Sequence, residues 1–384
     1  MTGKRLLAAF LGASLLLSGC GPAGGSQGAF DASSEENGKL KVAVTLFPYY
    51  DFVRQIAGDQ VDLQMVIPAG MDSHSFEPTP ADIRMIQHAD VLISNGGTME
   101  HWLEDTLGAL DTSNMTIVTM MDYVDTVEEE IVEGMEDAGH DHDHAHSHAA
   151  ADDHDHSHET PEEHAAHAQE ADDHDHSGET PEEHAAHAQE ADDHDHSDYV
   201  DHDGHEEAIE YDEHIWTSPV NAMKLVDVIG ETLAEADPAH AEVFRQGAAD
   251  YKKELEEIDA GFREVSRNRK RNMIVMGDKF PFRYLADEYQ LDYRAAFSGC
   301  SSDTEPSAKT IAYLIDKVKE EQIPVVYYLE LSSHRVSEII GEETGAEPLL
   351  LHSCHNVTRA QFDAGITYAG LMRQNIENLR KGID

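Results

Sequence analysis

Cysteine is scarce in this 384-residue sequence, which has Cys20, Cys300 and Cys354 and no Cys-x-x-Cys pair. The cysteine spacing therefore gives no support for a zinc site built from paired thiolates. The His-Glu-x-x-His helix motif of zinc-dependent proteases is also absent. The sequence thus gives no direct support for an enzyme, and we expect no catalytic or cofactor-binding residues.

Basic residues are few as well, with 26 Lys and Arg against 77 Asp and Glu, so the formal net charge is −51. Such a surface repels nucleic acid and attracts cations. Nucleic acid is therefore excluded as a partner. The length is sufficient for two separate cores.

Long apolar runs are missing apart from Leu6 to Leu17, which follows Lys4 and Arg5 and leads to Leu-Ser-Gly-Cys20. This run is too short to span a bilayer comfortably. A basic start, an apolar core and small residues indicate a secretory signal, and the terminal Cys resembles a bacterial lipoprotein signal. We expect residues 1–20 to be this signal, with lipid on Cys20, and 21–38 to be a flexible tether. A plain signal peptide with an incidental Cys is the alternative.

Histidine, in contrast, is abundant, and most of the 26 His lie between Gly139 and His205. The tract alternates His with Asp and contains two near-identical 20-residue copies, starting at Ala151 and Ala171, and a truncated third copy. Imidazole favours zinc, copper, nickel and iron over calcium or magnesium. So few apolar residues cannot form a core, so we expect a disordered insertion over 138–206. The tract either gathers metal, senses saturation or buffers excess metal, and an acidic linker is the bland alternative.

Strand and helix patterns alternate on both sides of the tract, which predicts an α/β fold. We expect two lobes, each with a parallel sheet flanked by helices, joined by one long rigid helix. The predicted boundaries are 39–216 for the N-terminal lobe, 217–270 for the linking helices and 271–384 for the C-terminal lobe. Strands are expected at 39–47, 61–67, 91–94, 115–120, 273–276, 325–329 and 349–351.

Two histidines outside the tract lie in loops where elements end. His74 follows a predicted strand and precedes the Thr79-Pro80 helix start, and His214 comes just before the linking helices. Ligands of open parallel sheets bind at the carboxyl ends of strands. Each His alone would more often be structural, but together with the tract they predict a metal site.

Several motifs resemble the substrate-binding lipoproteins of ABC importers for zinc and manganese, and the resemblance covers roughly 40–125 and 210–384. The His-rich insertion before His214 is typical of the zinc members. The motifs are Asp-Ser-His-Ser-Phe-Glu-Pro-Thr-Pro at 72–80, Asp-Glu-His-Ile-Trp at 212–216, and weaker ones at 47–59, 89–102, 305–307 and Asn375.

The resemblance implies one metal in the cleft between the lobes, with His74 and His214 as ligands from the first lobe. It implies Glu330 as a ligand from the second lobe, although Glu330 could instead cap a helix. The remaining family ligand, usually His, has no match here: its place falls on Gly277 or Asp278, and Asp278 is our candidate. Zinc is favoured over manganese as the transported ion.

Cys300 and Cys354 form a candidate disulfide, because a cysteine pair outside the cytoplasm is most simply bonded. Free thiols or metal-bound thiolates are the alternatives. The sequence His352-Ser-Cys354-His355 could also hold a metal, but with the disulfide in place both His would be loop residues beside the cleft.

The expected function is that of an extracytoplasmic metal receptor, anchored to the cell membrane by lipid, that delivers its ion to an ABC permease. It is expected to be a monomer and not an enzyme. A surface metal buffer or adhesin is the first alternative. A hydrolase with an open zinc site is the second.

Overall fold

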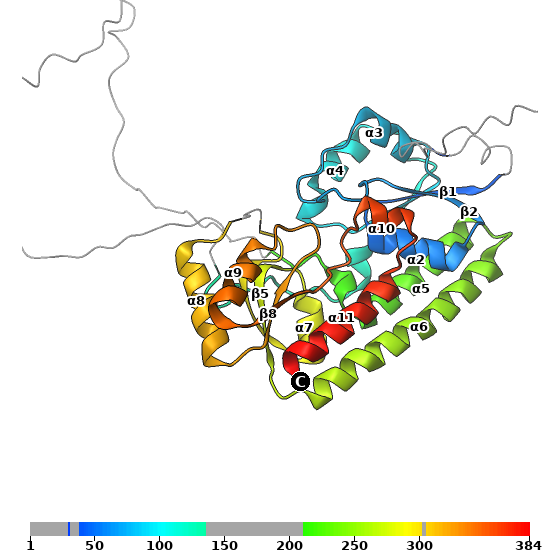
Figure 1. Ribbon diagram of the computed structural model, residues 1–384. Helices are drawn as coiled ribbons and strands as arrows, with labels where there is room; N and C mark the ends of the chain where they lie inside the picture. Colours follow the sequence, from blue (N-terminus) through cyan, green and yellow to red (C-terminus); the bar gives the residue numbers. More distant parts are fainter. Residues whose placement is uncertain (1–29, 31–37, 136–209, 302–304) are drawn as a thin grey trace, which may run out of the picture. The chain divides into compact units, whose positions relative to one another are not determined.

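The structure is a computed structural model that describes Phe30 and residues 38–135, 210–301 and 305–384 (Figure 1). Cys20, nearly all of the signal and tether, and the predicted insertion over 138–206 lie outside the described residues. No helix in the described part of the chain is long and apolar enough to cross a membrane.

The first sheet is parallel, with the strand order β2-β1-β3-β4. The first strand ends at Val44 and not at 47 as predicted, because Phe47 already begins α2 and Pro48 lies in its first turn, where its missing N–H costs nothing. Thr79 caps α3 in a capping box with Asp82. The elements are β1 (Leu40–Val44), α2 (Phe47–Ala57), β2 (Val61–Met65), α3 (Pro80–Gln87), β3 (Val91–Ser94), η1 (Thr98–Glu100), α4 (His101–Gly108), β4 (Thr116–Thr119) and η2 (Met120–Tyr123).

Two helices link the lobes: α5 (Pro219–Ala236), preceded by η5 (Ile215–Thr217), and α6 (Ala241–Asn268). The buried positions of α6 recur every three or four residues from Phe244 to Val265, which gives it one apolar face. This face packs on α2 and α11 (Figure 1). At Gly247 a Cβ would lie 2.1 Å from the Ile56 carbonyl oxygen, so glycine permits this close approach to α2.

The second sheet is also parallel, with the order β6-β5-β7-β8, and this confirms the two-lobed α/β fold. β6 has no counterpart among the predicted strands, because its Asp-Tyr-Arg-Ala-Ala-Phe-Ser sequence contains no β-branched residue although most of it is buried. The elements are β5 (Met273–Phe280), α7 (Arg283–Tyr289), β6 (Asp292–Ser298), α8 (Ala308–Glu320), β7 (Val325–Tyr328), α9 (Arg335–Thr344), β8 (Glu347–Leu350), α10 (Arg359–Asp363) and α11 (Tyr368–Ile383).

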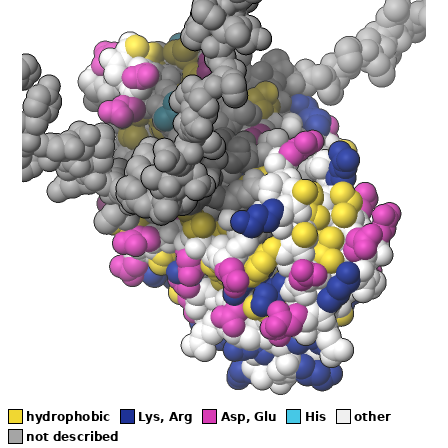
Figure 2. All heavy atoms as spheres, turned by 90° about the vertical axis from the view of Figure 1, so that its left-hand side faces the viewer, with side chains coloured by type: hydrophobic (Ala, Val, Ile, Leu, Met, Phe, Trp, Pro, Cys, Tyr) yellow, Lys and Arg dark blue, Asp and Glu magenta, His cyan; other side chains and the backbone are white. Residues whose placement is uncertain are grey.

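One hydrophobic core contains residues of both sheets and of the linking helices, so the lobes share buried contacts. Trp216, which is fully buried beside α5, belongs to this core. On the face shown in Figure 2, acidic and basic side chains are interspersed among small hydrophobic patches. The excess negative charge is therefore not gathered into one acidic field on this face.

Candidate metal centre

A cavity of about 310 Å³ lies where loops of both lobes meet. Its lining includes His74 from the loop after β2 and His214 from the segment before α5. It also includes Glu330 from the loop after β7 and His355 from the loop after β8. Three of these four residues follow the carboxyl end of a parallel strand, which is where open sheets bind ligands.

Three of the lining histidines form a compact triangle. The ring centroids of His74 and His214 are 6.0 Å apart, and the centroid of His355 is 5.6 Å from each of them. One nitrogen of each ring lies within 4.8 Å of the other two. Zinc–imidazole bonds are 2.0–2.1 Å long, so the three nitrogens would have to close in around a shared zinc ion. We call these three residues the tripod.

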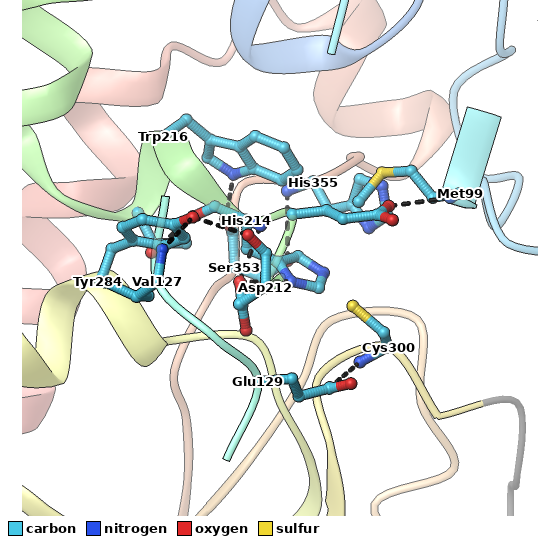
Figure 3. A network of polar contacts seen from close by, with 12 residues as sticks. Met99, Val127, Glu129, Asp212, His214, Trp216, Tyr284, Cys300, Ser353 and His355 are labelled. Carbon is cyan, nitrogen blue, oxygen red and sulfur yellow. Dashed lines mark hydrogen bonds and ion pairs between the residues drawn. The ribbon is translucent and has the colours of Figure 1, made fainter. Parts of the chain in front are cut away.

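His214 is oriented by its own segment. Its Nδ1 lies 3.2 Å from the Oδ1 of buried Asp212, and its backbone N–H donates to the same oxygen at 2.8 Å. The Asp212 carbonyl in turn accepts from the Tyr284 hydroxyl at 2.7 Å (Figure 3). A carboxylate on one ring nitrogen fixes the other nitrogen as the metal donor. His214 therefore presents Nε2 to the centre of the tripod.

His355 follows β8 in the second lobe, yet its segment is bonded to the first lobe. The side-chain amide of Asn356 donates to the carbonyl oxygens of Pro68 at 2.9 Å and Met71 at 2.7 Å. The Ser73 hydroxyl lies 2.5 Å from His355 Nε2.

A further hydrogen bond to the segment of His355 comes from the hydrophobic core. The Trp216 indole N–H donates to the Ser353 carbonyl at 2.8 Å, as Figure 3 shows. The indole also lies beside two tripod rings, with centroid distances of 5.5 Å to His214 and 5.3 Å to His355. We call the tripod, together with Ser73 and residues 353–356, the tripod wall.

Two of the tripod imidazoles, those of His74 and His355, favour the neutral form that metals require. Burial, followed by the neighbouring His214, lowers the pKa of His74 to about 4. Burial and the two other tripod rings lower the pKa of His355 well below its usual value. At neutral pH a metal therefore need not displace protons from these two rings.

The opposite wall of the cavity consists of residues 277–279 and 329–335. Both predicted carboxylate ligands lie there, but each accepts hydrogen bonds from residues outside the tripod. Glu330 accepts from the Ser353 backbone N–H at 2.8 Å and from the Ser353 hydroxyl. Asp278 accepts from the N–H of Lys279 at 2.9 Å and, more weakly, from that of Leu329 at 3.3 Å. The structure thus brings His74 and His214 together and leaves Glu330 and Asp278 outside the tripod.

The predicted disulfide is wrong, because Cys300 and Cys354 are both free. Cys354 is fully buried and has a left-handed backbone with φ of 61°. The Cys300 N–H donates to the Glu129 carboxylate at 2.8 Å (Figure 3). Burial raises the pKa of both thiols, so neither provides a ready thiolate.

His355 is the residue that sequence reasoning undervalued. The spacing of His352 and His355 after a strand was the available signal, but the assumed disulfide placed both outside the site. His352 is buried and its Nδ1 accepts from the Cys354 N–H, so it supports the loop. His334 lines the cavity and stacks on Tyr328 at 4.0 Å. Ser73 and Asp212 lie in the motifs at 72–80 and 212–216, and only Asn356 had no sequence signal at all.

Two lobes with parallel sheets, joined by long helices around a cavity lined by imidazoles, are the architecture of a substrate-binding protein. The particular family follows from sequence: residues 42–382 match the family described as "Zinc-uptake complex component A periplasmic". The chain belongs to this family. The family is one of transport components and not of enzymes, which rules out the hydrolase alternative.

Among relatives, the zinc-binding protein AdcA of Streptococcus pyogenes serotype M18 is 31% identical over 347 residues, covering 90% of this chain and 56% of AdcA. The chain thus spans about half the length of that relative. The high-affinity zinc uptake system protein ZnuA of Bacillus subtilis is 26% identical over 369 residues, covering 96% of this chain and 94% of ZnuA.

Solved structures agree with this fold. The metal-dependent lipoprotein YcdH of Bacillus subtilis aligns with a TM-score of 0.62 and 25% identity, covering 90% of this chain and 99% of YcdH. The Zn(II)-bound ZnuA-like domain of Streptococcus pneumoniae AdcA aligns with a TM-score of 0.61 and 24% identity, with the same coverage. The second likeness bears on the fold alone.

Proposed function

We propose that this chain is the extracytoplasmic receptor of an ABC importer, that it binds zinc at the tripod, and that it hands the ion to the permease. The observation that carries this proposal is the convergence of His74, His214 and His355 on one point of the cavity. Three imidazole nitrogens suit zinc, and manganese prefers more oxygen ligands. The third imidazole from His355 supplies the nitrogen donor that the segment around Asp278 lacks.

The membrane attachment follows the same proposal. Lipid on Cys20 would hold the receptor at the outer face of the membrane beside its permease, and the relative in Streptococcus pneumoniae is itself called a zinc-binding lipoprotein. The receptor acts as a monomer in this proposal. Glu330 and Asp278 would become ligands only after leaving their present hydrogen-bond partners.

The test is metal retention by the full-length protein. Wild type and a variant with His74→Ala, His214→Ala and His355→Ala are loaded with equal zinc and manganese and dialysed against a chelator, and bound metal is counted by mass spectrometry. We expect one tightly held zinc in wild type that the triple variant lacks, while the His-rich tract is identical in both. Equal retention by the two proteins would refute the tripod as the receptor site.

Delivery needs a separate test, because binding alone does not distinguish a receptor from a surface buffer or adhesin. A strain that lacks the gene is grown in zinc-depleted medium and complemented with wild type or with the triple variant. Growth should return only with wild type. Full rescue by the triple variant would favour a role independent of the tripod.

A further inference from the structure

The cavity is much larger than a metal ion needs. One water molecule takes about 30 Å³ in the liquid, so a cavity of about 310 Å³ has room for roughly ten. A zinc ion on the tripod would fill only a small part of this space. The rest of the cavity lies between the tripod and the opposite wall, which supplies residues 277–279 and 329–335.

The fourth position of a tetrahedral zinc would face this space. The tripod supplies three nitrogens, and protein sites for zinc are almost always four-coordinate. Glu330 is bonded twice to Ser353, and its side chain is only 8% exposed. Asp278 is bonded to two backbone N–H groups. In this arrangement neither of these two carboxylates is free to take the fourth position.

The opposite wall also carries positive charge that lacks a partner. Within the described part of the chain, no hydrogen bond or ion pair engages the Lys279 ammonium or the Arg335 guanidinium. Lys279 is half-buried in the cavity lining, and its charge adds to burial and the neighbouring imidazoles in lowering the pKa of His355. A cation beside a dication is unfavourable unless an anion lies between them.

The start of α9 adds to the positive charge of this wall. Residues 333–336 line the cavity, and the N-cap residue His334 makes no side-chain capping hydrogen bond. The first N–H groups of a helix favour a negative charge, and Arg335 lies at the same point. The lining therefore places a metal tripod on one side and groups suited to an anion on the other.

We propose that the cavity takes zinc together with a small carboxylate anion, which supplies the fourth ligand oxygen and pairs with Lys279. This inference rests on the proposed function and specifies the cargo as a metal–carboxylate complex. Lys279 holds the anion next to the metal, while Arg335 and the start of α9 face a second carboxylate if the anion has one. Zinc bound by small organic acids is the class of cargo that fits.

Cobalt(II) tests this, because its visible absorption reports changes in coordination that zinc does not show. Full-length protein is loaded with one equivalent of cobalt in carboxylate-free buffer and titrated with acetate, and then with malonate. The spectrum of the triple tripod variant is subtracted to remove cobalt bound elsewhere, including the His-rich tract. If wild type and the triple variant give the same spectrum, the proposed function itself fails.

If cobalt binds to the tripod, we expect a saturable change in the spectrum with either carboxylate. Lys279→Met should weaken that carboxylate affinity roughly tenfold, because a charge-assisted contact is lost. The same variant should bind cobalt more tightly without carboxylate, because a like charge is removed. Lys381→Met, which changes an exposed lysine of α11 outside the cavity lining, is the matched control and should alter neither value.

Two outcomes would overturn the inference and leave the receptor function intact. The wild-type cobalt spectrum could stay unchanged when carboxylates are added, while the spectrum of Glu330→Gln changes. This result would make Glu330 the fourth ligand. Alternatively, wild type and Lys279→Met could respond equally, which would place the anion away from this wall.

Discussion

The two walls of the cavity differ in how their residues are held. In the tripod wall, Asn356 and Ser73 join the loop after β8 to the first lobe, and the Trp216 indole bonds the same loop. In the opposite wall, Glu330 bonds to Ser353, while Lys279 and Arg335 have no partner within the described residues. The tripod wall is thus held in place by hydrogen bonds, whereas the opposite wall has two basic side chains without a partner among the described residues.

The two walls also share an unusual backbone feature. Both walls contain residues in the left-handed region, namely Cys354 in one and Leu331 and His334 in the other. Such residues persist where the surroundings hold them, and they often occur at binding sites. Cys354 lies between Ser353 and Asn356, which are both bonded to the rest of the molecule. We therefore expect the metal affinity to depend mainly on the tripod wall, and we propose that the opposite wall adapts to what accompanies the metal.

The largest effect should come from the tripod itself. His355→Ala removes one of three nitrogen donors, so its loss of zinc affinity should exceed the roughly 100-fold that changes in supporting residues can cause. Glu330→Gln keeps a hydrogen-bonding group beside Ser353 and should lower the affinity less than about tenfold. Competition with a coloured chelator measures both. Equal losses of zinc affinity in the two variants would contradict the expected difference between the walls.

A smaller effect is expected from the clamp between the lobes. Asn356→Ala removes the bonds to the Pro68 and Met71 carbonyls, so His355 should be less well positioned and zinc affinity should fall about 10- to 100-fold. Stopped-flow release of zinc to a chelator measures this as a faster dissociation rate.

Asn378→Ala is the matched control, because its side-chain amide also donates to a carbonyl, that of Leu350, but does so within the second lobe. Both variants should lose a similar amount of folding stability, about 1–3 kcal/mol for a buried hydrogen bond. Only Asn356→Ala should release zinc faster. Equal release rates in the two variants would mean that the clamp does not position the tripod.

The sequence predicted the fold and two corners of the tripod for clear physical reasons. Strand and helix periodicity is local, and loops at the carboxyl ends of parallel strands gather at one edge, so His74 and His214 could be placed. His355 also follows a strand, but the expected disulfide placed it outside the site, and its actual position depends on the contacts of Asn356 and Ser73 across the lobes. Long-range side-chain contacts of this kind leave no pattern in sequence spacing.

The third prediction concerns how the stability of the metal-free protein depends on pH. Folded His74 has a pKa of about 4, but the unfolded imidazole titrates near 6.5. Between these values the unfolded chain binds the proton and the folded chain does not, so the metal-free protein should lose stability as pH falls from about 6.5 toward 4. His355, whose pKa is also lowered, should act in the same direction.

Denaturant unfolding of chelator-treated protein at pH 7, 6 and 5 measures the effect. The stability of wild type relative to His74→Asn should decrease by about 2 kcal/mol from pH 7 to pH 5, because the variant lacks this titration. Lys279→Met should reduce the decrease, since its ammonium helps to keep His74 neutral. A constant difference between wild type and His74→Asn over this range would mean that His74 takes up protons freely in the fold. Each metal ion that binds below pH 6.5 would then have to displace a proton from the tripod.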